Sequence, residues 1–138
     1  MEKLTLDGLI FSTTEINIDN HILTITLNRP EKKNAINNVM MNELNYVITY
    51  AKQEKNIRVV VINAKGDIFC AGADLSRAES ESNVPELDHA NDISLSLRHL
   101  YKPVICSIQG SVLAGALLMV TNSTHAIAVK DAKFSAPE

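Results

Sequence analysis

Two stretches of small residues could present backbone N–H groups to a ligand. One is "FCAGADL" at residues 69–75, and the other is "LAGA" at residues 113–116, inside the longer stretch "ICSIQGSVLAGALLMV". Glycine and alanine cover little of the backbone, and the first turn of a helix has N–H donors without intrahelical partners. Two such donors aimed at one oxygen form an oxyanion hole, which stabilises negative charge as it develops on a carbonyl.

Close packing is a second explanation for the same small residues. Either stretch alone is explained more simply by a helix and a strand that approach each other closely. The position of both stretches is also suitable for a site, because each comes soon after a strand-like apolar run. Ligands of open α/β sheets bind outside the carboxyl ends of the strands.

Other kinds of catalytic site have little support in this sequence. The four histidines lack the spacing of metal ligands, so we expect no metal site. Gly110 and Ser111 are adjacent, but the G-x-S-x-G spacing of a nucleophile elbow is absent. Cys70 and Cys106 lie in apolar runs, which indicates buried free thiols rather than a disulfide.

An alternation of predicted strands and helices would position the two stretches. The alternating pattern of residues 21–28 predicts a strand that forms a hairpin with residues 9–17 across Asp19 and Asn20. Asn37 or Asn38 is a suitable N-cap for the helix that follows. Further helices are predicted over 39–53, 91–101 and 114–122, and further strands over 57–66 and 102–110. Residues 125–138 are predicted to form a strand followed by an extended segment. The β-branched run at 57–66 is typical of a parallel strand buried on both faces, and residues 76–91 read as a mobile loop.

Length and composition limit the class of protein. A chain of 138 residues with 46% hydrophobic and 21% charged residues fits one globular α/β domain, which we place over residues 1–138. The net charge of −3, without a basic face, argues against a nucleic-acid partner. We expect no membrane span and no secretory signal, and therefore a cytoplasmic protein.

Five motifs in one order give the sequence a recognisable pattern. They are "LNRPEKKNAIN", "FCAGADL", "KPVICSIQG", "LAGA" and the terminal "FSAPE". Together they resemble the crotonase superfamily, the enoyl-CoA hydratase and isomerase family, over about residues 10–138. The resemblance implies a ββα spiral core. It also implies that family members continue beyond the last motif, so we expect a fragment or a shortened form that lacks the C-terminal part of the domain.

The resemblance places the two oxyanion-hole donors on the backbone N–H groups of Ala73 and Gly115. These groups would polarise the carbonyl of an acyl-CoA thioester substrate. The family's coenzyme A contacts fall on matching positions of this chain, namely Lys33, Ala35, Ala71, Asp74 and Leu75. Arg29, Lys32 and Lys33 could also meet its phosphates, although exposed cations in a loop are often only solvated. No separate cofactor is implied, since coenzyme A is part of the substrate.

The sequence departs from the family's hydratases at one catalytic position. These enzymes hold a water between two glutamates, and the first of them would stand at Leu118. The second closes the F-x-x-P-E motif and is present as Glu138. A single carboxylate favours double-bond isomerisation over hydration, and the alternative is a catalytically silent acyl-CoA binder or an inactive fragment. A complete domain would be expected to form a homo-oligomer, a trimer or a dimer of trimers.

Overall fold

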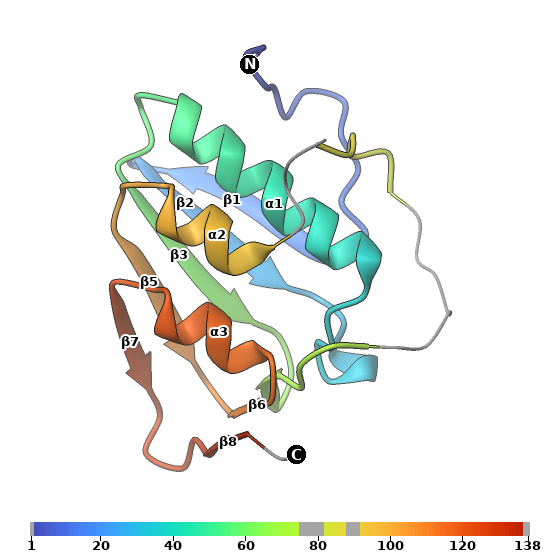
Figure 1. Ribbon diagram of the computed structural model, residues 1–138, viewed down its shortest axis with the longest axis vertical. Coiled ribbons are helices and arrows are strands. Elements are labelled where there is room, and N and C mark those ends of the chain that lie inside the picture. The colour runs from blue at the N-terminus through green and yellow to red at the C-terminus, as the bar shows by residue number, and fades with distance from the viewer. Residues whose placement is uncertain (1, 75–81, 88–91, 137–138) are drawn as a thin grey trace.

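The chain folds as repeated units of two strands and a helix (Figure 1). The structure is a computed structural model that describes residues 2–74, 82–87 and 92–136. The strands are β1 (Thr14–Asp19), β2 (Ile22–Leu27), β3 (Val59–Ala64), β4 (Ile68–Cys70), β5 (Val104–Ile108), β6 (Ser111–Leu113), β7 (His125–Ala128) and β8 (Phe134–Ser135). The helices are α1 (Asn38–Gln53), α2 (Ile93–Arg98) and α3 (Ala116–Thr121), with a 3-10 turn at Pro30–Lys32. The expected α/β fold with a ββα spiral core is confirmed.

The predicted hairpin is present and pairs β1 with β2 antiparallel. Asn20 and His21, which form the turn, both have positive φ (50° and 66°), as in the tight turns whose twist matches that of paired strands. The first strand starts at Thr14, later than expected, because the chain before it is bound to α1 instead of to a strand. The fully buried carboxylate of Glu43 accepts hydrogen bonds from the backbone N–H groups of Ser12 and Thr13.

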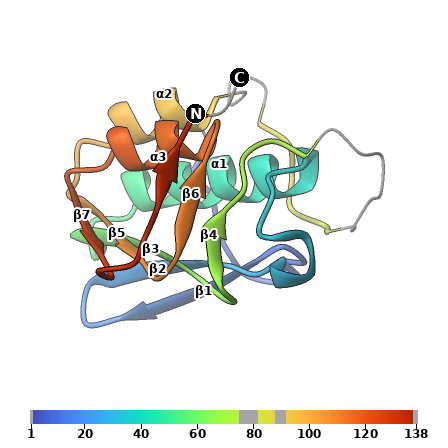
Figure 2. The same ribbon diagram turned by 90° about the horizontal axis from the view of Figure 1, so that it is seen from below.

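The larger sheet has the strand order β1-β2-β3-β5-β7, and β2, β3, β5 and β7 run parallel. The helices cover one face of it (Figures 1 and 2). Along β3, Val60 and Ile62 are fully buried, whereas Val59 and Val61 on the other face are only partly buried. The expectation that this strand is buried on both faces is therefore wrong, because no described helix packs against the second face.

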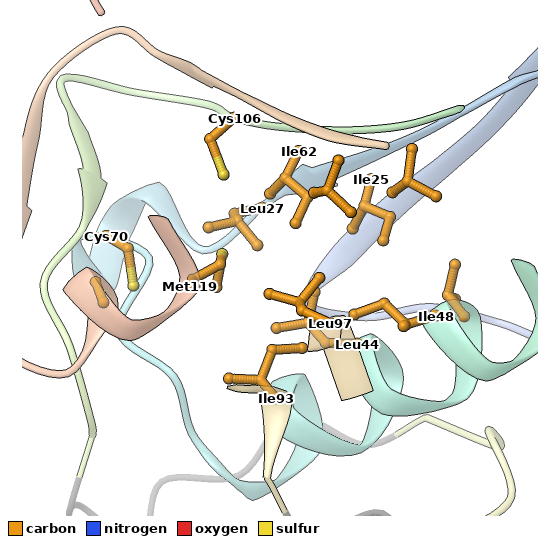
Figure 3. Close-up of a cluster of buried hydrophobic side chains, with 14 of the residues drawn as sticks. Ile25, Leu27, Leu44, Ile48, Ile62, Cys70, Ile93, Leu97, Cys106 and Met119 are labelled. Atoms are coloured by element: carbon orange, nitrogen blue, oxygen red, sulfur yellow. The ribbon is translucent and has the colours of Figure 1, made fainter. Parts of the chain in front are cut away.

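The hydrophobic core lies between the helices and the larger sheet (Figure 3). It includes Ile25, Leu27, Leu44, Ile48, Ile62, Ile93, Leu97 and Met119. Cys70 and Cys106 are fully buried free thiols, as predicted. Burial raises the pKa of both thiols to about 11, so both stay protonated at neutral pH and neither is a reactive nucleophile. In the described ranges, no helix has the length and apolar content needed to cross a membrane.

A second sheet, with the order β4-β6-β8, was not expected from the sequence. Its strands are parallel and stand at a steep angle to the larger sheet (Figure 2). β4 and β6 have three residues each and β8 has two, too few to show a periodic pattern. The predicted strand–helix alternation is wrong in this respect, because β4 and β6 follow β3 and β5 directly. Parallel pairing brings the segments after β4 and β6 to the same end of this sheet.

Gly72 allows these two segments to touch. Its φ is +94°, which side chains rarely allow. A Cβ added there would lie 3.1 Å from the Ala114 Cβ, 3.1 Å from the Leu113 carbonyl oxygen and 3.3 Å from the Gly115 nitrogen. A glycine is therefore required at position 72 for both conformation and space.

Replacing Gly72 with alanine should strongly destabilise the protein. The left-handed conformation and the steric overlap together should lower the free energy of unfolding by about 2–4 kcal/mol. Urea denaturation measures this difference. Gly115→Ala is the matched control, because a Cβ at Gly115 has no neighbour within 4 Å and its φ is −59°. A change below about 0.5 kcal/mol is expected for the control, and equal losses in both variants would contradict the role of Gly72.

Candidate active site

The predicted oxyanion-hole residues lie next to each other. Gly72 packs against Ala114 and the backbone nitrogen of Gly115, so that Ala73 and Gly115 come from neighbouring segments after β4 and β6. Both residues are exposed, whereas Gly72 between them is buried. The structure thus brings together the two backbone positions that the sequence singled out.

The bridge between Ala73 and Ile36 determines the direction of the Ala73 N–H. Ala73 forms a parallel bridge with Ile36, in which the Ile36 N–H donates to the Gly72 carbonyl (2.7 Å) and the Asp74 N–H donates to the Ile36 carbonyl (2.9 Å). In such a bridge the N–H and C=O of the middle residue point to the opposite side. The Ala73 N–H therefore faces away from Ile36.

Gly115 is not required to be glycine by the fold. It is the N-cap of α3, with ordinary right-handed φ and ψ of −59° and −20°. The space that a Cβ would occupy is open. Among the described residues, no backbone carbonyl accepts a hydrogen bond from the Ala73 or Gly115 N–H. Two adjacent backbone positions without a backbone acceptor for their N–H groups, one of them with open space where a side chain would be, suit the binding of a carbonyl oxygen.

The turn before Gly115 is held in an uncommon conformation. Ala114 has a φ of +52°, although it is not glycine. Its N–H donates to the Ser135 carbonyl (2.8 Å), and its carbonyl accepts from the Leu117 N–H (3.0 Å). Non-glycine residues at positive φ are uncommon and persist where their surroundings fix them. Here β8 on one side and α3 on the other fix the turn that presents Gly115.

The loop between β2 and α1 supports the segment of Ala73, the second of the two predicted donors. Asn34 is fully buried, and its side-chain amide donates to the carbonyls of Lys65 and Ile68 (2.8 and 2.9 Å). Its side-chain oxygen accepts from the Arg29 N–H (2.8 Å). These bonds join the loop to the turn between β3 and β4. The sequence analysis did not single out Asn34. Its residue type is the available signal, because asparagine tolerates positive φ, and Asn34 has a φ of 55° in this structure.

The residues predicted to contact coenzyme A gather beside this loop. The Ala71 N–H donates to the Lys33 carbonyl (3.0 Å), and Ala35 and Asp74 flank the bridge between Ile36 and Ala73. Leu75 and most of the predicted mobile loop at 76–91 lie outside the described residues. The structure therefore places four of the five predicted contact residues around one short bridge.

The side chain of Arg29 is buried, whereas an exposed cation was expected at this position. Its side chain is only 5% exposed, and its guanidinium donates to the Asp74 carboxylate (3.1 Å) and to the Ala35 carbonyl. Because the protein itself occupies these donors, the expectation that Arg29 meets coenzyme A phosphates is not supported. Lys32 and Lys33 are exposed and remain the available cations of this loop.

The resemblance links two positions to proton transfer, Leu118 and Glu138. Leu118 is 54% exposed on α3, one turn after Gly115, and its N–H donates to the Gly115 carbonyl (3.1 Å). Glu138 lies outside the described residues, and β8, which ends three positions before it, pairs with β6. Within 2–74, 82–87 and 92–136 there is no group of three or more His, Cys, Asp or Glu side chains that could hold a metal ion.

Comparison of the sequence with known proteins shows which family the chain belongs to. The family model described as enoyl-CoA hydratase/isomerase matches residues 17–138. The chain is 34% identical over 125 residues to the trans-2-decenoyl-[acyl-carrier-protein] isomerase of Streptococcus mutans, covering 86% of this chain and 48% of that protein. It is also 34% identical over 121 residues to the mevalonyl-coenzyme A hydratase of Aspergillus fumigatus, covering 86% of this chain and 45% of the relative.

Solved structures agree with the sequence relatives. A probable enoyl-CoA hydratase from Mycobacterium smegmatis superposes with a TM-score of 0.77 at 32% identity, over 91% of this chain and 52% of that one. An enoyl-CoA hydratase/isomerase from Pseudoalteromonas atlantica gives 0.79 at 28% identity, over 91% and 50%. The chain thus spans about half the length of these relatives, and it matches the N-terminal part of the domain. This 138-residue chain belongs to the enoyl-CoA hydratase/isomerase family, the crotonase superfamily.

Proposed function

We propose that the full-length protein acts on enoyl-CoA thioesters and moves a carbon–carbon double bond rather than adding water to it. The observation that carries this proposal is the adjacent, exposed pair of backbone positions Ala73 and Gly115, with open space where Gly115 lacks a side chain. The thioester oxygen would accept hydrogen bonds from both N–H groups. The family to which the chain belongs supports an acyl-CoA thioester as substrate.

The proposed reaction transfers one proton between two carbons of the acyl chain. A base removes a proton from C2 of a 3-enoyl thioester, and the electron pair of the broken C–H bond spreads over C2, C4 and the thioester oxygen. The two N–H donors stabilise the negative charge on that oxygen, each by roughly 3–4 kcal/mol. The same proton is then returned at C4, which leaves the double bond between C2 and C3 and restores the base.

Glu138 is the proposed base and Leu118 the reason to favour isomerisation. Hydration in this family needs two carboxylates to hold and activate one water, and Leu118 has no group that can carry a proton. Loss of one acid–base group costs about 10²- to 10⁴-fold in rate. Isomerisation needs a single carboxylate, because one base can remove and return the proton.

Coenzyme A would lie along the loop before α1 and the segment after β4. The proposed contact positions are Lys33, Ala35, Ala71, Asp74 and Leu75. The exposed ammonium groups of Lys32 and Lys33 suit the phosphates of the nucleotide end. The full-length protein is proposed to form trimers or dimers of trimers.

The proposed function is tested by assaying the full-length protein with 3-enoyl-CoA and trans-2-enoyl-CoA substrates. We expect conversion of the first to its 2-enoyl isomer, and hydration of the second at least 10-fold slower. Because one relative is named as acting on an acyl carrier protein, 3-enoyl thioesters of both carriers should be compared. Calorimetry with a non-reactive acyl-CoA separates the alternatives: binding without turnover indicates a silent binder, and a folded protein with neither contradicts the proposal.

Replacing Glu138 with glutamine should abolish most of the isomerase activity. The amide keeps the size of the side chain but cannot accept the proton, so kcat should fall by about 10²- to 10⁴-fold while binding of the non-reactive acyl-CoA stays unchanged. Asp131→Asn, which neutralises an exposed carboxylate seven positions earlier, is the matched control and should keep full activity. A fully active Glu138→Gln protein would remove Glu138 from the mechanism.

Replacing Leu118 with glutamate should create hydratase activity. A carboxylate one turn after Gly115 would supply the second acid–base group, so hydration of trans-2-enoyl-CoA should rise at least about 10-fold. Stability should change by less than about 0.5 kcal/mol, because this side chain is 54% exposed. Leu118→Gln has the same size without a titratable group. Equal hydration rates in the two folded variants would show that position 118 does not reach the reacting water.

A further inference from the structure

We infer that the buried ion pair between Arg29 and Asp74 is a positioning device for the Ala73 N–H. This inference rests on the proposed function and deepens it, because it assigns the Asp74 side chain to the support of the oxyanion hole and leaves the contact proposed at position 74 with coenzyme A to the main chain. Asp74 is the residue directly after Ala73. Its carboxylate accepts a hydrogen bond from the Arg29 guanidinium at 3.1 Å.

Burial makes this ion pair sensitive to the loss of either partner. The side chains of Arg29 and Asp74 are only 5% and 12% exposed. Removing one partner from such a pair takes away a charge that compensates the other in a poorly solvated place, which is strongly destabilising. One member of the pair, Asp74, lies next to Ala73 in the chain.

Arg29 holds both chain segments that form the bridge at Ala73. One guanidinium nitrogen donates to the Ala35 carbonyl, in the loop segment, and the other donates to Asp74, in the segment after β4. The backbone N–H of Arg29 is itself fixed by the side chain of Asn34 (2.8 Å). A planar guanidinium can hold two acceptors in a fixed relative position, which an ammonium group cannot.

The direction of the Ala73 N–H depends on the alignment of Ile36 with Ala73 in their bridge. Ile36 donates to the Gly72 carbonyl and accepts from the Asp74 N–H, so the peptide groups on both sides of Ala73 are fixed by one residue of the loop. A shift of Ile36 relative to Asp74 would rotate both peptide groups and re-aim the N–H between them. A misplacement of about 1 Å at a catalytic group can cost about 10²-fold in rate.

Variants of the full-length protein test the inference. Asp74→Asn and Arg29→Gln each remove one charge, and the double variant removes both. Each single variant should lower kcat by about 10- to 100-fold and leave the Kd for a non-reactive acyl-CoA within about threefold. The carbonyl stretching band of that bound thioester, labelled with ¹³C, should move back toward its frequency in solution. The double variant should recover part of the loss, because neither member of the ion pair then remains without the other.

Glu31→Gln is the matched control, since it neutralises an exposed carboxylate of the same loop. It should leave kcat, Kd and the carbonyl band unchanged. Two results would overturn the inference: a Kd that rises in Asp74→Asn with kcat unchanged, which would indicate direct contact with coenzyme A, or fully additive losses in the double variant.

An NMR measurement separates this inference from the proposed function. The amide resonances of Ala73 and Gly115 can be followed in the free protein, without substrate. Arg29→Gln, a change far from Ala73 in the sequence, should shift the Ala73 amide, and Glu31→Gln should not. If the wild-type protein neither binds nor converts an acyl-CoA, the proposed function fails while the shifted Ala73 amide in Arg29→Gln still supports the positioning role. An unchanged Ala73 amide in Arg29→Gln would overturn that role even in an active enzyme.

Discussion

The contact between Gly72 and the segment before α3 is the constraint on which the site depends. The left-handed backbone at Gly72 and the absence of its Cβ let the end of β4 reach Ala114 and the nitrogen of Gly115. With any side chain at position 72, the neighbouring atoms of Leu113, Ala114 and Gly115 would have to move by a few tenths of an ångström, and the left-handed backbone would be strained. The parallel pairing of β4, β6 and β8 brings these segments near each other, and Gly72 closes the remaining distance.

A network of polar groups supports this contact from the other side. Asn34 and Arg29 are buried, the side chain of Asn34 bonds to three backbone groups, and the guanidinium of Arg29 donates to the Ala35 carbonyl and to Asp74. Buried polar groups that are fully paired fix a single arrangement, because any shift leaves one of them without a partner. The apolar core between the sheet and the helices stabilises the domain, whereas this polar network determines where the backbone of the site lies.

Much of the fold, and the proximity of the two small-residue stretches, could be predicted from the sequence. The hairpin turn at Asn20, the N-cap at Asn37 and the proximity of Ala73 to Gly115 are as expected, because each depends on a local pattern or on motifs shared with a family. The short strands β4 and β6 were not predictable from periodicity. Neither was the pairing of Arg29 with Asp74, which are 45 positions apart, because sequence spacing carries no information on such a contact.

The proposed donors at Ala73 and Gly115 are atoms of the main chain, and this determines how the site can vary. Exchange of the Ala73 side chain leaves its N–H in place, so a scan by alanine substitution would pass over both donors. A peptide-to-ester replacement deletes such a hydrogen atom, and so does a substitution by proline, which has no backbone N–H. Among relatives that share about a third of their residues with this chain, the donor pair can persist as long as the course of the backbone does.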